Sequence, residues 1–444
     1  MSFDERAIIE HVLQQRWYGA KSRGIAHSEV LDTVVVRDTP PVLALALVEM
    51  RYETGAHDLY QLLYSVRDGE VEIDDDVALA RELVGSLHTG VSLAGDDGTV
   101  EFHTVPGSPR LRPEPIDVRS VDAEQSNTSV VLDDEMILKV FRRLEPGLNP
   151  ELEMLRFLTE HGFANSPPLV GWYAYAGGRL SATLGILQAF VSGALDGWEL
   201  ALDELAEAPD RFLGRLQRLG EVTGEMHTVL ASDQGDPSFA AETPSAETLG
   251  LLTATIDEEV GRMFIELPGD EALLEPIAGR GEEVREQLRS LTLGGPAGKV
   301  IRVHGDYHLG QTMWANDDWV VLDFEGEPAR AFAERRRKRS PLRDVAGMLR
   351  SFAYAATAVS LLRGVEPPDG WEEEARSQFL DGYFASVDQS LLPPGQAAIE
   401  RLLSVFELEK AVYELRYELD NRPDWIGIPV AGIQRLIEQP AAAS

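Results

Sequence analysis

The sequence predicts an α+β protein made of two or three lobes. Strand-like runs fill the first half of the chain, and long amphipathic segments fill the second half. The 444 residues also exceed the size at which a single hydrophobic core stops growing, about 250–300 residues. Strands and helices that are segregated along the chain favour separate layers over alternating strand–helix–strand units.

Two groups of strands are predicted before residue 192. A short helix at 6–15 precedes the first group, whose β-branched and aromatic runs we expect to form a small antiparallel sheet: 30–37, 42–52 and 58–67. The second group surrounds a helix at 150–161 with apolar residues at helical spacing, and comprises 99–105, 129–132, 136–141, 169–175 and 184–190.

The chain becomes mostly helical after residue 193. A strand–loop–strand unit at 299–322 interrupts the predicted amphipathic helices, which are 199–205, 211–231, 248–267, 271–291, 344–362, 371–387 and 397–420.

The composition excludes several classes of protein. With 40 Lys plus Arg against 75 Asp plus Glu, the formal net charge is −35, so we expect no nucleic-acid or membrane partner. The chain has no cysteine, which excludes disulfides, zinc–thiolate sites, iron–sulfur clusters and thiol catalysis. The N-terminus is charged where a signal peptide would be apolar, and the longest apolar run, near 41–48, is too short to span a membrane. We therefore expect a cytoplasmic protein.

The strongest functional signal is the stretch VHGDYHLGQ at 303–311. Asp306 follows Gly305, which permits a sharp turn; Gln311 comes five residues after the acid, and Asp323 twelve residues later, beyond an apolar strand. In phosphoryl transfer one carboxylate accepts the proton of the attacking hydroxyl, while an amide and a second carboxylate hold Mg²⁺ against the nucleotide phosphates. The alternative, that these residues only cap turns, leaves the preceding His-Gly unexplained.

The two histidines of this stretch have different expected roles. We expect His304 to be buried and to hydrogen-bond loop carbonyls. For His308 two interpretations stay open, contact with the substrate or a structural role.

A second cluster of candidates lies upstream. Lys139 stands alone in an apolar strand, where a charge is costly unless it meets an anion such as a phosphate. Glu153 on the next helix is the expected partner of this lysine, although an exposed strand face is the alternative setting for Lys139. A small polar loop at 124–129 would cover the phosphates with backbone and hydroxyl donors, with Ser126, Asn127, Thr128 and Ser129 as candidates.

These motifs resemble those of the bacterial maltokinases, which are ATP-dependent kinases of eukaryotic-kinase-like fold related to aminoglycoside phosphotransferases. The resemblance covers nearly the whole chain and rests on HGDYHLGQ, LDFEGEP, EQSNTS, FRRLEPGLNPELE, QRWYGAKSR, SPLRDVAGMLRS and ELEKAVYELRYELDNRPDW. The chain departs from the protein-kinase pattern in having Gln311 in place of Asn and Glu325 in place of the Gly of Asp-Phe-Gly.

The resemblance implies roles for five residues. Asp306 would be the catalytic base, Gln311 and Asp323 the Mg²⁺ ligands, and Lys139 with Glu153 the pair that binds the nucleotide phosphates. ATP and Mg²⁺ are the implied cofactors.

The resemblance also implies a bilobal, protein-kinase-like arrangement. It consists of an N-terminal cap subdomain at 1–90, a β-rich nucleotide-binding N-lobe at 91–192 and a helical C-lobe at 193–444. Gln188 and Phe190 would lie in the link between the lobes, where adenine meets backbone groups.

The last helices would bind the acceptor sugar. Lys410, Tyr413, Glu414 and Tyr417 fall on one helical face, and Trp425 follows where Pro423 ends the helix. Aromatic rings beside charged groups suit a sugar, but ordinary packing of the two tyrosines is the alternative.

The family favours phosphorylation of maltose to maltose 1-phosphate for α-glucan synthesis, with trehalose synthase as a partner. Glucosamine kinases are related, and an acidic C-terminal helix would suit an ammonium group, so glucosamine 6-phosphate is the alternative product. A non-catalytic pseudokinase is the third alternative, but it would lack a base, a metal ligand or the nucleotide lysine, and this sequence has them all.

One basic run stands out in this acidic chain. For residues 335–339, RRRKR, a solvated loop is the favoured interpretation, and a place at the mouth of the cleft is the alternative.

Overall fold

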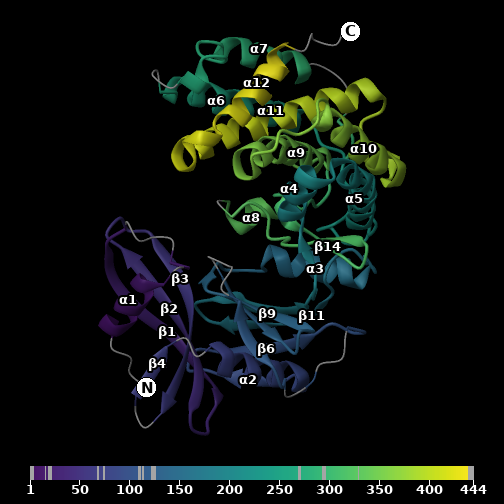
Figure 1. Ribbon diagram of the computed structural model, residues 1–444. Helices are drawn as coiled ribbons and strands as arrows, with labels where there is room; N and C mark the ends of the chain where they lie inside the picture. Colours follow the sequence, from purple (N-terminus) through teal and green to yellow (C-terminus); the bar gives the residue numbers. More distant parts are fainter. Residues whose placement is uncertain are drawn as a thin grey trace. The chain divides into compact units, whose positions relative to one another are not determined.

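The computed structural model describes residues 5–15, 17–18, 23–67, 70–73, 76–108, 112, 115–121, 127–268, 272–292, 297–328 and 330–438. The chain divides into two compact units, residues 1–193 and 194–444 (Figure 1). Unit 1 is built on β-sheets and unit 2 is mostly helical, so the predicted α+β class is confirmed.

Unit 1 begins with a five-stranded antiparallel sheet, which we call the cap sheet. Its strand order is β1-β2-β3-β10, and β4 also pairs with β3. The strands are β1 (Ile25–Arg37), β2 (Val42–Tyr52), β3 (His57–Arg67), β4 (Glu70–Ile73) and β10 (Arg143–Leu144), and the helix α1 (Glu5–Gln14) contacts β1. Leu45 and Val48, on opposite sides of β2, are both fully buried, which explains the unbroken apolar run of this strand.

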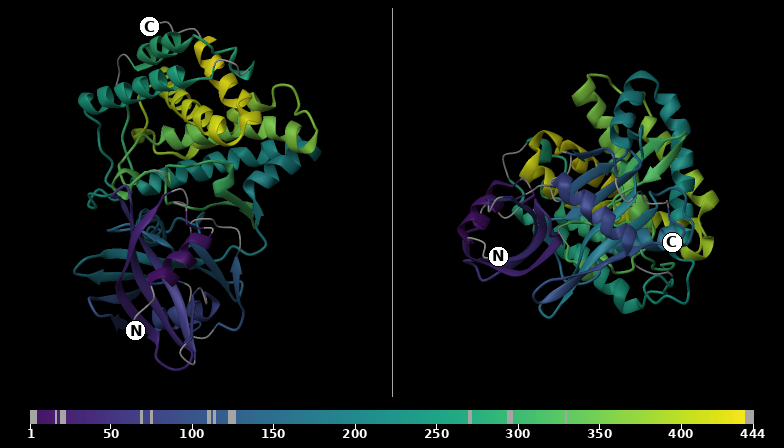
Figure 2. Two further views of the ribbon diagram at one scale, coloured as in Figure 1. Left: turned by 90° about the vertical axis from the view of Figure 1, so that its left-hand side faces the viewer. Right: turned by 90° about the horizontal axis from the view of Figure 1, so that it is seen from below.

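The second sheet of unit 1 has seven antiparallel strands in the order β5-β6-β11-β12-β9-β8-β7. Its strands are in the blue part of the ribbon in Figures 1 and 2. They are β5 (Ser92–Ala94), β6 (Gly98–Thr104), β7 (Val118–Val121), β8 (Asn127–Leu132), β9 (Met136–Phe141), β11 (Leu169–Gly177) and β12 (Ser181–Ala189). Helix α3 (Pro150–Glu160) begins at the N-cap Asn149, whose side chain accepts hydrogen bonds from two backbone N–H groups of the first turn.

Helix α2 (Asp76–Thr89) is an element that we did not predict. Its signal is present in the sequence, because the buried residues Leu79, Leu83, Val84 and Leu87 recur at helical spacing. The helix contacts strands of both sheets, including β1 and β6.

Asp32 of β1 joins the two sheets. Its buried carboxylate accepts hydrogen bonds from the backbone N–H of Asp96 (2.7 Å) and Gly98 (3.0 Å), in the turn between β5 and β6, and from the hydroxyl of Tyr175 (2.6 Å). Burial alone would raise the pKa of Asp32, but these hydrogen bonds hold it below its usual value. An ionised carboxylate therefore fastens the cap sheet to the second sheet.

Unit 2 is mostly helical and contains a three-stranded sheet of order β13-β14-β15, which packs against α4 and α5. The strands are β13 (Leu195–Asp196), β14 (Thr312–Ala315) and β15 (Asp318–Val321). The helices are α4 (Gly197–Glu207), α5 (Pro209–Leu230), α6 (Ala246–Glu266), α7 (Gly281–Thr292), α8 (Phe332–Arg335), α9 (Leu342–Arg363), α10 (Trp371–Ser386), α11 (Gln396–Asn421) and α12 (Gly427–Glu438).

Helix α9 is the apolar centre of unit 2. By length and composition this helix could cross a membrane, although no apolar run of the sequence predicted a spanning segment. Of its most apolar 18 residues, 67% is buried inside the fold. It packs against α11, α4 and α10. Its hydropathy is therefore that of a core helix.

Candidate active site

The loop that carries Asp306 is held by a buried carboxylate on α9. Asp344 accepts hydrogen bonds from the backbone N–H groups of His304 (2.7 Å) and Gly305 (2.9 Å), and its Oδ2 lies 3.2 Å from Nε2 of His227 on α5. Burial would raise the pKa of Asp344, but the hydrogen bond and charge of His227 and the loop N–H groups hold it below its usual value. The loop therefore rests on an ionised group in the core.

His304 is buried and bonds a loop carbonyl, as predicted. Its Nε2 lies 2.7 Å from the carbonyl oxygen of Leu322, so this nitrogen carries the proton, and Nδ1 is left to accept the backbone N–H of Asp306 at 3.4 Å. Gly305, at φ 89°, and Gly326, at φ 75°, lie against each other, and a Cβ on Gly305 would sit 3.4 Å from Cα of Gly326. The loop of Asp306 and the loop after Asp323 thus approach closely.

Asp306 is partly buried and is held as a carboxylate. Nζ of Lys410 on α11 lies 3.2 Å from Oδ1, and Nε2 of His308 lies 3.9 Å from Oδ2. Burial would raise the pKa of Asp306, but the charge of Lys410, and after it that of His308, holds it below its usual value. Burial lowers the pKa of His308, whereas Asp306 raises the pKa of Lys410 against the effect of burial. The predicted base is therefore ionised, beside a protonated lysine.

The two predicted Mg²⁺ ligands lie at the same end of a hairpin. Thr312 of β14 pairs with Val321 of β15, and the carbonyl of Gln311 accepts a hydrogen bond from the N–H of Leu322 (2.9 Å). Gln311 and Asp323 therefore flank the end of the hairpin. Asp323 has φ 59°, a left-handed conformation that non-glycine residues rarely adopt and that often occurs at functional positions.

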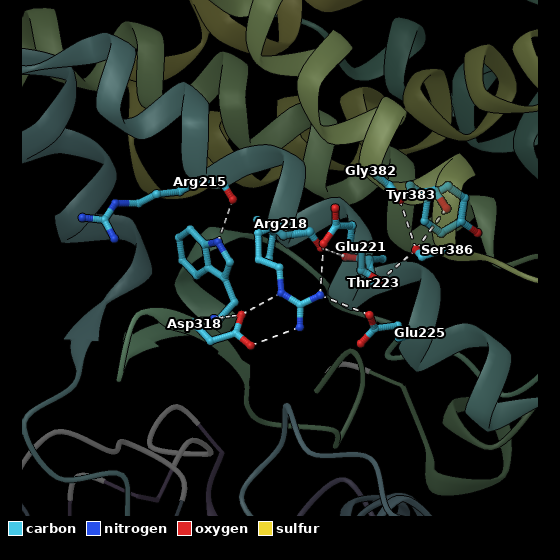
Figure 3. A network of polar contacts seen from close by, with 11 residues as sticks. Arg215, Arg218, Glu221, Thr223, Glu225, Asp318, Gly382, Tyr383 and Ser386 are labelled. Atoms are coloured by element: carbon cyan, nitrogen blue, oxygen red, sulfur yellow. Dashed lines mark hydrogen bonds and ion pairs between the residues drawn. The ribbon is translucent and has the colours of Figure 1, made fainter.

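The turn of this hairpin is anchored on α5 (Figure 3). Arg218 forms a two-bond ion pair with Asp318, with N–O distances of 2.9 and 3.0 Å, and also contacts Glu221 and Glu225 at 3.1 Å each. The indole N–H of Trp319 donates to the carbonyl of Arg215 (2.9 Å). Helix α5 thus fixes the strand that leads to Asp323.

A cavity of about 200 Å³ opens within unit 2 beside Asp306. Its wall comes from the catalytic loop, the segment after Asp323 and helices α6, α9 and α11. It holds seven acidic and seven basic side chains: Glu259, Glu266, Asp306, Glu327, Glu334, Asp344 and Glu409, and Arg262, Arg330, Arg335, Arg339, Arg343, Lys410 and Arg416. In a chain of net charge −35 this balance is local enrichment of cations.

In unit 1, Lys139 has a partner that we did not predict. Its Nζ lies 2.8 Å from Oε1 of Glu151, the second residue of α3, and both side chains are buried. Glu153, two residues further along the helix, is buried as well. The role of Glu153 beside Lys139 stays a prediction.

The predicted phosphate loop is shorter than we expected. Ser126 lies outside the described residues, whereas Asn127, Thr128 and Ser129 are the first residues of β8. The hydroxyl of Thr128 accepts a hydrogen bond from Nε of Arg142 (2.8 Å), and Ser129 is buried opposite Lys139. These three side chains belong to a strand and are not part of a covering loop.

Gln188 and Phe190 lie at the end of β12. Gln188 is two residues from Ile186, which pairs with Lys139, so the side chains of Gln188 and Lys139 share one face of the sheet. Oε1 of Gln188 is buried and has no hydrogen-bond partner among the described residues. The N–H of Phe190 donates to the carbonyl of Glu135 (2.8 Å), and Arg119 lies 5.5 Å from the centre of its ring.

Comparison with known proteins decides the family. A family model described as "Phosphotransferase enzyme family" matches residues 117–375, more than half of the chain, and a model described as "Maltokinase N-terminal cap domain" matches residues 11–95. The chain belongs to the phosphotransferase enzyme family. The predicted phosphotransferase activity and the predicted kinship with maltokinases and aminoglycoside phosphotransferases are therefore confirmed.

Known relatives of this phosphotransferase include two glucosamine kinases. The one from Streptacidiphilus jiangxiensis is 28% identical over 335 residues, which are 72% of this chain and 74% of the relative. The one from Mycolicibacterium smegmatis is 27% identical over 336 residues, 72% of this chain and 80% of the relative. The structure of a glucosamine kinase in complex with glucosamine, ADP and inorganic phosphate matches with a TM-score of 0.73 at 23% identity, covering 96% of both chains. The predicted kinase-like fold is confirmed by this likeness.

The candidate sugar-binding residues of helix α11 do not all face the cavity. Lys410 and Tyr413 line the cavity, with Nζ of Lys410 5.2 Å from the centre of the Tyr413 ring. Glu414 is buried and forms a two-bond ion pair with Arg350 of α9, at 2.8 and 3.0 Å. The prediction that Glu414 contacts the acceptor is therefore wrong, because α9 covers that side of α11.

Two further sugar candidates, Tyr417 and Trp425, are not part of the cavity wall. Tyr417 is 46% exposed, with Arg422 5.4 Å from its ring centre. Trp425 stacks on Tyr354 with 6.3 Å between ring centres, and Arg422 lies 4.9 Å from its ring. The predicted single sugar-binding face thus divides into a cavity part and an outer aromatic part.

The basic run 335–339 is not a solvated loop. Arg335, only 7% exposed at its side chain, donates to the carbonyls of Arg330 (2.6 Å) and Pro328 (2.7 Å). Arg335 and Arg339 line the cavity, and Lys338 bonds the carbonyl of Pro237 (2.7 Å). Through Arg335, the run therefore stabilises the segment that follows Asp323.

Sequence reasoning missed Arg343 and Asp344. Arg343 forms an ion pair with Glu409 in the cavity wall, and Asp344 holds the catalytic loop. The only local signal of Arg343 and Asp344 is a pair of charges at the start of a strongly apolar helix, which is an unfavourable place for a charge without a partner.

Proposed function

We propose that this phosphotransferase is an ATP-dependent sugar kinase, and that its acceptor is a small amino sugar, with glucosamine as the first candidate. The observation that carries the proposal is the ionised Asp306 at the wall of a charged cavity. A carboxylate in this setting can accept the proton of a sugar hydroxyl as the phosphoryl group is transferred.

The residues of unit 1 fit a nucleotide. Lys139 supplies a buried cation for the phosphates, and the unpartnered Oε1 of Gln188 on the same sheet face is the type of buried polar atom that a bound ligand satisfies. Phe190 offers an aromatic surface beside it. Asn127, at the open end of β8, is the remaining candidate of the phosphate loop.

The ends of the β14–β15 hairpin fit Mg²⁺. Among the described residues no group of three or more His, Asp or Glu side chains could hold a metal ion. Mg²⁺ in kinases uses few protein ligands and completes its shell with phosphate and water oxygens. Gln311 and Asp323 supply two oxygen ligands of this kind, and the bound ion would neutralise charge on the phosphates.

The cavity contains a carboxylate that suits an ammonium group. Partial burial and the neighbouring Glu409 raise the pKa of Glu259, and they outweigh the opposite effect of Arg330 and Arg343. Glu409 is already paired with Arg343, and no cation lies within ion-pair distance of Glu259 in the described part of the chain. An ammonium group beside Glu259 would relieve this repulsion, which favours an amino sugar over a neutral one. The two relatives described above are glucosamine kinases, which also supports an amino sugar as the acceptor.

Maltose is the second candidate, because the maltokinase cap model matches residues 11–95. Its product would be maltose 1-phosphate for α-glucan synthesis. Docking of trehalose synthase and a cytoplasmic location stay predictions from the sequence.

Incubation of the full chain with Mg²⁺–ATP and single sugars tests the proposal. We expect glucosamine to be phosphorylated at O6, with much lower turnover of glucose and N-acetylglucosamine, which share its hydroxyl groups but lack the ammonium. The phosphorylated position is read by NMR. Phosphate on maltose O1 and none on glucosamine would reverse the order of the two candidates, and no sugar phosphate at all would contradict the proposal.

A further inference from the structure

The chain between Lys139 and its partner Glu151 belongs partly to the cap sheet. Strand β9 ends at Phe141 and helix α3 starts at Pro150. Between them, Arg143 and Leu144 form β10, which pairs with Tyr60 and Leu59 of β3 in the cap sheet. The cap sheet therefore holds the connection that links the lysine to the glutamate.

Gln61 of β3 fills the point where two strands of the second sheet diverge. The last residue pair between β9 and β12 is Val140 with Gly185, and Phe141 and Leu184 are the next residues on each strand. Nε2 of Gln61 donates to the carbonyl oxygens of both, at 3.1 and 2.8 Å. The side-chain amide of Gln61 thus replaces the next backbone hydrogen bonds that β9 and β12 would form with each other.

The Gln61 amide is fully used and fully buried. Its two N–H donors go to the two carbonyls, and its Oε1 accepts the hydroxyl of Tyr173 at 3.3 Å. Its backbone N–H donates to the carbonyl of Arg142 at 2.8 Å. An apolar side chain here would remove the donor that serves two buried carbonyls and the acceptor of the Tyr173 hydroxyl, and losing such a partner in a buried place costs more than the bond itself contributes.

These contacts lie behind the strand that carries Lys139. Tyr173 crosses the sheet at Gly185, where an added Cβ would lie 2.5 Å from its ring, so Tyr173 is on the face of Gly185 and Val140. Lys139 is the next residue to Val140 and points to the opposite face. Anchoring the end of β9 from behind fixes the direction in which Lys139 projects in front.

Arg143 adds a second fastening. Its guanidinium donates twice to Oδ1 of Asp58 on β3, at 2.7 and 3.1 Å, and Oδ2 of Asp58 accepts the hydroxyl of Tyr52 at 2.8 Å. Both residues that flank the end of β9, Arg142 through its carbonyl and Arg143 through its side chain, are thus bound to β3.

We propose that strand β3 of the cap is part of the nucleotide-binding machinery, with Gln61 as the positioning residue for Lys139. The cap is then an integral brace of the nucleotide site and not a detachable regulatory module. The inference rests on the proposed nucleotide role of Lys139.

Replacement of Gln61 by leucine tests the proposal in the full chain. We expect Gln61→Leu to raise the KM for ATP and the Kd for ADP about tenfold, while the KM for the sugar changes less than twofold. Gln378→Leu, on an exposed face of α10, is the matched control and should change neither. A purely structural role would lower the active fraction and leave both KM values as they are.

A milder variant keeps the test decisive if Gln61→Leu does not fold. Tyr173→Phe removes the hydroxyl that donates to Oε1 of Gln61 and keeps the ring, and we expect about a twofold to threefold rise in the KM for ATP alone. Unchanged ADP affinity in folded Gln61→Leu, or in Tyr173→Phe if the first variant does not fold, would overturn the proposal. Lys139→Ala separates the two levels: if it leaves ATP affinity unchanged, the nucleotide role of Lys139 is wrong, whatever Gln61 does.

Discussion

The catalytic loop and helix α11 both contribute to the candidate site, but their residues are fixed in different ways. In the loop, the backbone N–H groups of His304 and Gly305, the two residues before Asp306, donate to the buried carboxylate of Asp344. On α11, spacing brings Lys410 and Glu414 to one side of the helix, yet the first faces Asp306 and the second faces Arg350. Local spacing therefore defines a loop site, whereas the role of a helical residue depends on which helix packs beside it.

The largest expected effect is on the loop itself. Asp306→Asn should reduce kcat by about 10²–10⁴-fold, because the amide cannot accept the hydroxyl proton. The Kd for ADP, measured by calorimetry, should stay within twofold. If Asp306→Asn turns over as fast as the unmodified chain, Asp306 is not the base. If the unmodified chain is itself inactive, the pseudokinase alternative is favoured.

Removing the support of the loop should cost stability as well as activity. Asp344→Ala leaves two buried N–H groups and His227 without their acceptor, and we expect a loss of about 3–5 kcal/mol in the free energy of unfolding. Chemical denaturation measures this change. Asp381→Ala on the exposed side of α10 is the control, and equal stability of the two variants would contradict the role of Asp344.

The division of α11 can be tested by two substitutions on the same helix. Glu414→Ala breaks the buried pair with Arg350 and should lower the free energy of unfolding by about 3 kcal/mol with the sugar KM unchanged. Tyr413→Ala should raise the sugar KM, by an expected several-fold, at little cost in stability. Asp420→Ala, exposed on α11, is the control. A raised sugar KM in Glu414→Ala without loss of stability would restore the face predicted from spacing.

The smallest effect concerns pH. Lys410 holds the pKa of Asp306 below its usual value, so the base stays ionised to a lower pH than an ordinary aspartate. In Lys410→Met this pKa rises, and the acid limb of kcat/KM should move to higher pH. Lys299→Met is the control. An acid limb at the same pH in both variants would contradict the electrostatic role of Lys410.

Much of the fold follows from the sequence because most elements have a strong period. The strands β2 and β3 and the helix α3 lie close to their predicted ranges. The two-residue strand β10 could not be predicted, since it exists only through its pairing with β3. Helix α2 was missed although its apolar residues have helical spacing.

The site shows the same limit. Gln311 and Asp323 lie at the same end of a short hairpin, because β14 and β15 pair directly between them. The pairing of Lys139 with Glu151, and of Glu414 with Arg350, depends on contacts between separate elements that spacing cannot reveal. The basic run was misjudged for this reason too, because the carbonyls that Arg335 binds are made available only by the fold of the preceding loop.

The arrangement of the second sheet bears on where this protein can be divided. Strand β6 pairs with β11 along seven residue pairs, from Gly98–Gly177 to Thr104–Gly171. The family match starts at residue 117, so a fragment cut there would lose β5 and β6 and present β11 as a bare edge. Unpaired edges invite strand addition by other chains and hence aggregation. The part of the chain that matches the family is therefore smaller than the sheet to which it belongs.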